Sequence, residues 1–181
     1  MSIKNLYGEC DTPEEIYQFY KKINTKNQES IENALNEMEI LCKKYDRAEC
    51  YVLYGKLYEK LFNINEAYKY YRKAIECNPK NAAYYAVLSE VYLQHSQFDD
   101  AIEISTYLIE HPSLKNYHYY VSKREVRLLA SCCASRWEIA KEDITYLPED
   151  FVIYIYPVKG RITKQRIEKA IQTQTPLLFD E

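Results

Sequence analysis

The chain has 181 residues, of which 47% are hydrophobic and 28% charged, and its formal net charge is −3. These proportions are typical of a folded protein, and the length suits one domain or a short array of repeats. The slightly negative charge gives no general attraction for polyanions, so we expect no nucleic-acid partner.

Several classes of protein are disfavoured by what the sequence lacks. It has no apolar run of about 18 residues, and its start, "MSIKNLYGECD", has no apolar signal region, so we expect no membrane insertion and a cytoplasmic location. The cysteines form no CxxC motif, which favours reduced, mostly buried thiols. A zinc site is the less favoured alternative, because the three histidines show no ligand spacing with cysteine. We therefore expect no metal and no cofactor.

The first predicted hairpin covers residues 12–47. Thr12 is the predicted N-cap of its first helix, with Pro13 in the first helical position. A second helix follows over 31–41, with Ala34 as a small residue on its apolar face. The apolar face of the first helix consists of Ile16, Phe19, Tyr20 and Ile23.

The second predicted hairpin, residues 48–81, has the clearest pattern. Asn63 followed by Glu66 predicts a helix start with a capping box, and Pro79 predicts the end of that helix. Residues at helical spacing define one face of each helix. These are Tyr51, Tyr54, Tyr58 and Leu61 in the first helix, and Ala67, Tyr71, Ala74 and Ile75 in the second.

The same pattern returns 34 residues later, over 82–115, which indicates an internal repeat. Ser96 is the predicted cap of its second helix, and Pro112 follows that helix. A further hairpin of altered length is predicted over 116–148, with Tyr119, Val126 and Leu129 facing inward and Ala140 as its small residue.

The C-terminal part, residues 150–181, departs from this pattern. The run "FVIYIYP" (151–157) has strand propensity, and three alternatives stay open: a short helix, an extended segment against the last hairpin, or an edge strand pairing with another chain. Next comes an amphipathic helix with Thr163 as a possible cap, which suits a capping helix at the end of an array. The tail "TPLLFDE" is predicted either to fold back on that helix or to be a docking motif.

Residues 48–81 resemble a tetratricopeptide repeat, a helical hairpin of 34 residues. The residues that match its pattern are Tyr51, Tyr54, Gly55, Tyr58, Ala67, Tyr71, Ala74 and Pro79. Residues 82–115 match more loosely, because Ser89 replaces the glycine and Ser105 the aromatic. The resemblance implies an all-α fold: a short right-handed α-solenoid of about three hairpins over 1–149, with a C-terminal capping helix. Gly55 and Ala67 would lie where the two helices approach most closely.

The resemblance also implies a concave groove, lined by the first helix of each hairpin, that receives a peptide or a helix of another protein. A solvated helix face would explain any one of these side chains equally well. The expected groove residues are Glu49, Val52, Lys56, Glu59, Ala83, Ala86, Glu90 and Leu93. If the third unit starts at Asn116, it adds Tyr120, Arg124 and Arg127.

No catalytic constellation or phosphate-binding loop is present in the sequence. We therefore expect a non-catalytic interaction module, either an adaptor or a subunit of a larger complex. One alternative is a self-associating structural subunit. The other is a regulatory protein or enzyme that uses Cys132 or Cys133, near Arg127 and Arg136, although adjacent cysteines in a helix are more often packing residues.

Overall fold

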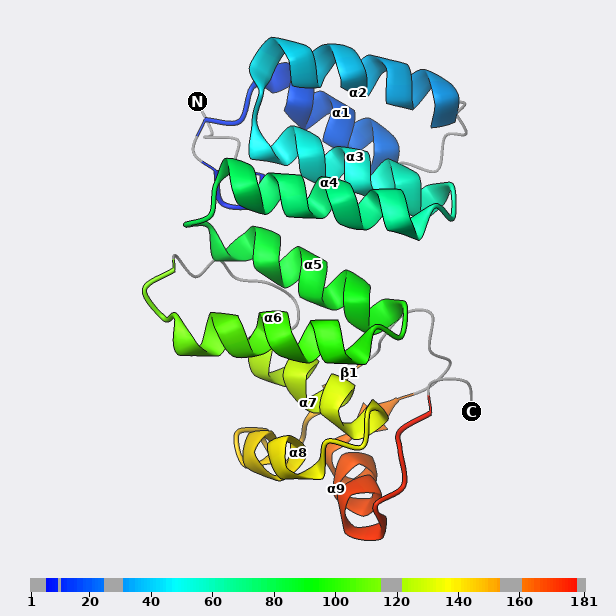
Figure 1. Ribbon diagram of the computed structural model, residues 1–181, viewed down its shortest axis with the longest axis vertical. Helices are drawn as coiled ribbons and strands as arrows, with labels where there is room; N and C mark the ends of the chain where they lie inside the picture. The colour runs from blue at the N-terminus through cyan, green and yellow to red at the C-terminus, as the bar shows by residue number, and fades with distance from the viewer. Residues whose placement is uncertain (1–5, 10, 25–30, 115–121, 154–160, 179–181) are drawn as a thin grey trace. The chain divides into compact units, whose positions relative to one another are not determined.

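The computed structural model describes residues 6–9, 11–24, 31–114, 122–153 and 161–178. Within these ranges the chain forms nine α-helices and two short strands (Figure 1). The helices are α1 (Glu14–Asn24), α2 (Ile31–Tyr45), α3 (Ala48–Lys60), α4 (Ile64–Cys77), α5 (Ala82–Gln94), α6 (Phe98–Glu110), α7 (Lys123–Cys133), α8 (Trp137–Ile144) and α9 (Lys164–Thr173). The prediction of an all-α protein built from tetratricopeptide-like hairpins is confirmed.

The chain divides into two compact units, and the boundary between them falls within α5. Unit 1 comprises Met1–Tyr84 and Leu114–Tyr117, and unit 2 comprises Tyr85–Ser113 and His118–Glu181. The predicted division into hairpins 12–47, 48–81, 82–115 and 116–148 stays a prediction. No helix in the described part of the chain is long and apolar enough to cross a membrane.

Unit 1 is held together by apolar faces at helical spacing. Ile16, Phe19 and Met38 are almost completely buried, and Leu53 and Leu57 of α3 complete the same core. The helices α3 and α4 lie side by side along their length (Figure 1). Helix α1 therefore buries the apolar face that its sequence predicts.

Helices α3 and α4 approach each other closely at Gly55. A Cβ atom on Gly55 would lie 2.7 Å from ring atoms of Tyr71, which is itself 1% exposed. Ala67 and Ala74 of α4 are also fully buried. Only residues without bulk fit between the two helices here, as the repeat pattern predicts.

The helix starts agree only partly with the predicted caps. Asn63 accepts a hydrogen bond from the backbone N–H of Glu66 at 3.4 Å, which is half of the predicted capping box. The backbone N–H of Asn63 donates to the Tyr58 carbonyl oxygen at 2.9 Å and not to the Glu66 side chain. Ser96 does not cap α6: it has a φ of 59°, and Gln97 occupies the N-cap position without a side-chain hydrogen bond. The left-handed turn at Ser96 therefore replaces a side-chain cap.

Thr12 does not cap α1 either. Its hydroxyl oxygen accepts from the backbone N–H of Leu6 at 3.0 Å, and the hydroxyl donates to Glu49 Oε1 at 3.1 Å. The first backbone hydrogen bond of α1 runs from Tyr17 to the Pro13 carbonyl oxygen at 3.0 Å. Thr12 thus fastens the N-terminal segment to α3 instead.

Unit 2 contains α6 packed against α7, and α7 packed against α8. A capping box starts α7, with Ser122 and Glu125 each bonding the other's backbone N–H. Ala101 and Ala140, the predicted small residues, are fully buried. Leu129 is also fully buried, as predicted, whereas Tyr119 lies outside the described residues.

Of the three alternatives for the C-terminal run, the described residues Val152 and Ile153 agree with an extended segment. Strand β1 (Val152–Ile153) pairs antiparallel with β2 (Ile162–Thr163), so its partner lies in the same chain. Residues 154–157 of the predicted run lie outside the described residues. The Thr163 hydroxyl caps α9 by accepting from Arg166 N at 3.2 Å, as predicted.

Candidate protein-binding surface

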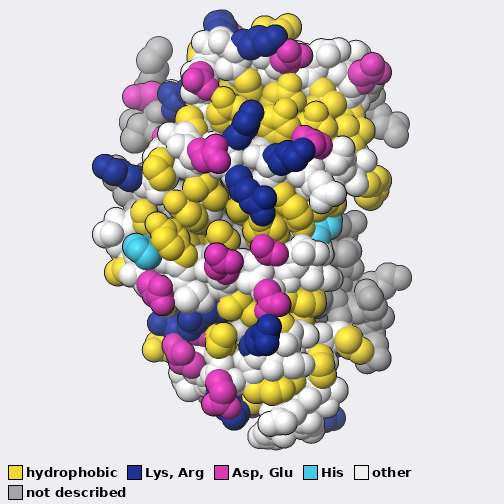
Figure 2. Space-filling view, in the orientation of Figure 1, with side chains coloured by type: hydrophobic (Ala, Val, Ile, Leu, Met, Phe, Trp, Pro, Cys, Tyr) yellow, Lys and Arg dark blue, Asp and Glu magenta, His cyan; other side chains and the backbone are white. Residues whose placement is uncertain are grey.

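The tyrosines of the best repeat form a stack on the α3–α4 face of unit 1. The ring of Tyr70 lies 4.6 Å from that of Tyr54 and 5.3 Å from that of Tyr58, with nearly parallel planes. All three rings are half-buried, and the ammonium group of Lys73 lies 5.5 Å from the Tyr70 ring centre. Figure 2 shows hydrophobic side chains on this part of the molecule, with basic side chains among them. The stack packs α3 against α4 and leaves each of the three tyrosines partly exposed to solvent.

Two of the predicted groove residues lie half-buried on α3, and both already interact within unit 1. The Lys56 ammonium lies 5.4 Å from the ring centre of Tyr7 and 5.6 Å from that of Tyr20, which is cation–π geometry. Glu59 accepts a hydrogen bond from the hydroxyl of Tyr71. A partner would therefore meet a lysine and a carboxylate that neighbouring aromatic residues hold in place.

The remaining predicted positions of unit 1 are not on the surface. Val52 is completely buried, and Ala83 is 2% exposed. Glu49 is 1% exposed and accepts a hydrogen bond from Arg47 at 2.9 Å as well as the one from Thr12. These three side chains stabilise unit 1 and offer no area to a partner in this structure.

In unit 2, Ala86, Glu90 and Arg124 are half-buried, whereas Leu93 is 3% exposed. The Arg124 guanidinium lies over the Tyr146 ring at 3.8 Å and donates to Asp143 at 3.1 Å. Tyr120, the remaining predicted residue of this region, lies outside the described residues. Ala86, Glu90 and Arg124 are therefore the predicted positions of unit 2 that a partner could touch.

Arg127 has a structural role. It is 7% exposed and donates two hydrogen bonds of 2.7 Å to the carboxylate of Asp143, which is 1% exposed. A third hydrogen bond, of 3.1 Å, goes to Glu142. The bond with Asp143 is the main reason that the pKa of Arg127 is raised, so this ion pair fastens α7 to α8 at every physiological pH.

A pocket of about 540 Å³ opens in unit 1 where three segments meet. It lies between the N-terminal segment, the α2–α3 corner and the α4–α5 corner. Both acidic and basic side chains line the pocket. The Glu9 carboxylate accepts hydrogen bonds from the side-chain amides of Asn78 and Asn81 at 2.7 and 3.0 Å. The lining residues are Gly8, Glu9, Asp46, Arg47, Ala48, Glu49, Cys77, Asn78, Lys80 and Asn81.

The sequence pattern did not predict this pocket, because its three walls, at residues 8–9, 46–49 and 77–81, are far apart in the chain. The one local signal was "NPKN" at 78–81, which was read only as a helix stop. The N-terminal segment gave no periodic pattern, so nothing indicated that Tyr7 would lie against α1 and α3.

The two adjacent cysteines of α7 lack the features of a nucleophile. Cys132 is completely buried and Cys133 half-buried, and burial raises the pKa of each thiol to about 12. Thiols of this kind carry almost no thiolate at neutral pH. Among the described residues, no group of three or more His, Cys, Asp or Glu side chains is placed to hold a metal ion.

Two family models, both described as tetratricopeptide repeat, match the chain at residues 48–81 and 70–103. The first match has the limits predicted from the sequence, and it covers α3, α4 and the turn that follows. Residues 48–103 of the chain therefore match the tetratricopeptide repeat. Repeats of this family generally mediate protein–protein interactions and are typically non-catalytic. No curated protein matches the chain significantly.

Proposed function

We propose that this chain is a non-catalytic adaptor, or a subunit of a larger complex, that binds a peptide or a helix of another protein. The observation that carries this proposal is the tetratricopeptide repeat match over 48–103, on helices that pack as hairpins. Small residues at the helix contacts keep such hairpins rigid, and a rigid surface loses little entropy when it binds. The first helices of the hairpins, α3, α5 and α7, are the proposed binding elements.

The accessible predicted residues of each unit are of mixed character. Lys56 and Glu59 of α3 offer one charge of each sign, and Ala86 with Glu90 of α5 offers a small apolar side chain beside a carboxylate. Arg124 adds a guanidinium in α7. Mixed charge around apolar positions suits a partner segment that is itself amphipathic, because such a segment can match both components.

Affinity capture with the full chain, followed by mass spectrometry, identifies candidate partners, and titration calorimetry with the purified partner then measures affinity. We expect Lys56→Glu and Glu90→Lys each to weaken binding by about tenfold or more, as charge reversal in an interface does. The matched controls are Lys69→Glu in α4 and Glu103→Lys in α6, which make the same charge changes on second helices.

Equal losses of binding affinity in the test and the control variants would contradict the proposed surface, since they would indicate a general effect of charge. Circular dichroism of each variant checks that the fold is intact, because Lys56 also contacts Tyr7 and Tyr20. Failure to capture any protein partner under conditions where the chain is folded would contradict the proposed function itself.

A further inference from the structure

The N-terminal segment of unit 1, residues 6–9, lies against helices α1, α3 and α5. The centre of the Tyr7 ring is 6.5 Å from that of Tyr20 in α1 and 6.2 Å from that of Tyr84 in α5. The Lys56 ammonium of α3 lies 5.4 Å from the same ring centre. Leu6, the preceding residue, is 5% exposed and belongs to the core of the unit. The segment therefore covers Lys56, one of the expected groove residues.

The carboxylate of Glu9 is held by a set of donors at the α4–α5 corner. Its Oε1 atom accepts hydrogen bonds from the side-chain amides of Asn78 and Asn81, and from the Tyr84 hydroxyl at 2.7 Å. Asn81 is 4% exposed and Tyr84 is 1% exposed, so two of these donors are fixed in the interior. The Asn81 amide also donates to the Tyr7 carbonyl oxygen at 2.8 Å. The site thus recognises an aromatic ring and, two positions later, a carboxylate.

The segment fits this site imperfectly. Tyr7 has a φ of 53° and Asp11 a φ of 57°, in the left-handed region that residues with a side chain rarely adopt. The Tyr7 hydroxyl is buried, and within the described part of the chain it has no hydrogen-bond partner. A strained backbone and an unpaired buried hydroxyl both cost free energy. A segment that made the same contacts without these costs would bind the site more favourably than residues 6–9 do.

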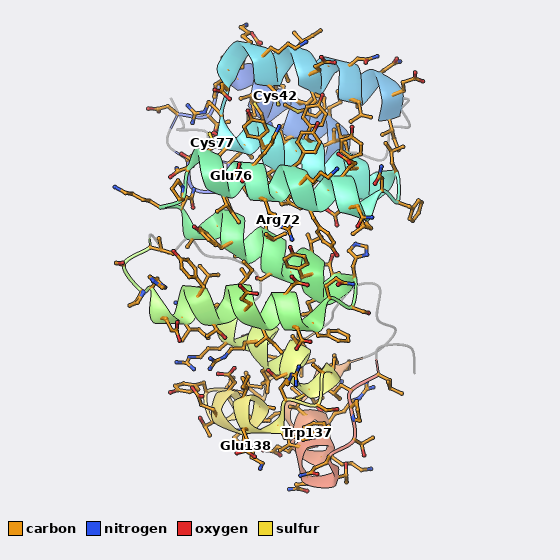
Figure 3. All side chains as sticks on the ribbon, in the orientation of Figure 1. Cys42, Arg72, Glu76, Cys77, Trp137 and Glu138 are labelled. Atoms are coloured by element: carbon orange, nitrogen blue, oxygen red, sulfur yellow. The ribbon has the colours of Figure 1, made fainter. Side chains whose placement is uncertain are left out.

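The pocket beside the segment gives such a chain a path from solvent to the site. Gly8 and Glu9 form one wall of this pocket. Cys77, at the end of α4, lines another wall and is exposed (Figure 3). The donors that hold Glu9 therefore lie next to an open surface.

We propose that residues 6–9 are an intramolecular cover of the binding surface. The partner displaces this cover with a segment that carries an aromatic residue followed two positions later by Asp or Glu. The inference rests on the proposed function, because it specifies the partner segment and adds a competitor from the chain itself. Such a cover lowers the apparent affinity for the partner in proportion to the fraction of molecules in which the site is open.

A peptide with the chain's own sequence tests the site without any captured partner. It copies residues 6–12, with serine in place of Cys10, and carries a fluorophore, so that fluorescence anisotropy measures its binding to the full chain. The release variant, Leu6→Ser/Tyr7→Ser/Glu9→Ser, removes the side chains that hold the cover. Because its site is open, we expect this variant to bind the peptide at least about tenfold more tightly than the wild type does. Circular dichroism checks that the variant is folded.

Matched controls test whether the peptide makes the described contacts. A control peptide, with alanine in place of Tyr7 and glutamine in place of Glu9, is expected not to bind the release variant measurably. Adding Lys56→Met to the release variant should weaken binding of the unchanged peptide by about two- to fivefold, because the ring loses its cation. Adding Lys73→Met instead, the same change beside the tyrosine stack, should leave the affinity unchanged.

Hydrogen exchange of the wild-type chain is a second measurement, which remains valid if the release variant fails to fold. In the cover, the Leu6 amide donates to the Thr12 hydroxyl oxygen and the Glu9 amide to the Leu6 carbonyl oxygen, both at 3.0 Å. Excess peptide is expected to speed exchange in the peptic fragment that contains these amides. The control peptide is expected to leave this exchange unchanged.

The proposal is overturned if the folded release variant binds the peptide no more tightly than the wild type, or if the control peptide binds equally well. It is also overturned if excess peptide leaves exchange in the wild-type cover unchanged. A captured partner that binds the wild type and the release variant equally overturns the cover but leaves the proposed function standing. Specific binding of the peptide without any captured partner supports the cover and contradicts the proposed function.

Discussion

At the scale of single residues, Gly55 decides how closely α3 and α4 pack. Replacing a glycine inside a helix by alanine ordinarily adds stability, by about 1 kcal/mol. Here the added Cβ would lie 2.7 Å from a tyrosine ring that is buried and whose hydroxyl is bonded to Glu59. Because that ring has little room to move, the steric cost outweighs the gain in helix propensity.

We therefore expect Gly55→Ala to lower the free energy of unfolding by about 1–3 kcal/mol, the range typical of overpacking. Urea denaturation measures the change, and the double variant Gly55→Ala/Tyr71→Leu is expected to recover part of the loss, because it removes the ring. A gain in stability from Gly55→Ala alone would show that the helices are not in this close contact.

Glu9 is the residue through which unit 1 should respond to acid. Burial pushes the pKa of its carboxyl up, but hydrogen bonds from Asn81, Tyr84 and Asn78, together with the charge of Arg47, outweigh burial and hold the pKa below its usual value. A carboxyl with a lowered pKa stabilises the fold above the unfolded-state pKa of about 4.3. This stabilisation by Glu9 is lost as the pH falls through the lower pKa that the carboxyl has in the folded state.

The variant Glu9→Gln tests this. At pH 7 the variant should unfold at a lower urea concentration than the wild type. The difference between their urea midpoints should narrow as the pH falls from about 5 toward 2. Glu138→Gln, a change at an exposed carboxylate of α8, is the control and should give no such gap. A difference in urea midpoint that stays the same at all pH values would mean that Glu9 stabilises unit 1 by its packing and not by its charge.

At the scale of elements, the C-terminal tail is fixed by one of two adjacent leucines. Leu177 is 6% exposed, and its backbone N–H donates to the Cys132 carbonyl oxygen at 3.3 Å, whereas Leu178 is 55% exposed. A buried leucine changed to alanine typically costs about 2–5 kcal/mol, and an exposed one costs little.

We expect Leu177→Ala to lower the midpoint of thermal unfolding by several degrees and Leu178→Ala to leave it nearly unchanged. Differential scanning calorimetry measures both. If the two variants behave alike, the tail does not fold back on α7, and its other interpretation, as a free docking motif, gains support.

The helices could be predicted from the sequence because helical periodicity is local, and so could the contact at Gly55, because the repeat pattern specifies a small residue there. Thr12 could not be assigned correctly: a hydroxyl before a helix suggests a cap, but its partners, Leu6 and Glu49, depend on the tertiary fold. The sequence indicates strand propensity at Val152, but it does not identify the pairing partner, Thr163. Pairing depends on how the tertiary fold brings the two segments together.

At the candidate surface, the sequence indicated which helix carries each residue but not how deeply it lies. Val52, Leu93 and Arg127 were expected in the groove, and the structure places all three in the interior. Burial depends on the segments that cover a helix, and the repeat pattern says nothing about these. The N-terminal segment is an example, since Tyr7 lies against Lys56 without any pattern that predicts it.

At the scale of the whole molecule, the functional interpretation rests on the match to the tetratricopeptide repeat over residues 48–103. Hairpins with rigid contacts and half-buried charges on their first helices are suited to holding another chain. The second helices, α4, α6 and α8, mainly pack the first helices and are not expected to contact a partner.

Hydrogen–deuterium exchange of the full chain, with and without its captured partner, tests this account most directly. We predict that the partner slows amide exchange in peptides from α3, α5 and α7, and that peptides from α4, α6 and α8 exchange at unchanged rates. Protection confined to the second helices, with no change in α3, α5 and α7, would contradict the proposed surface.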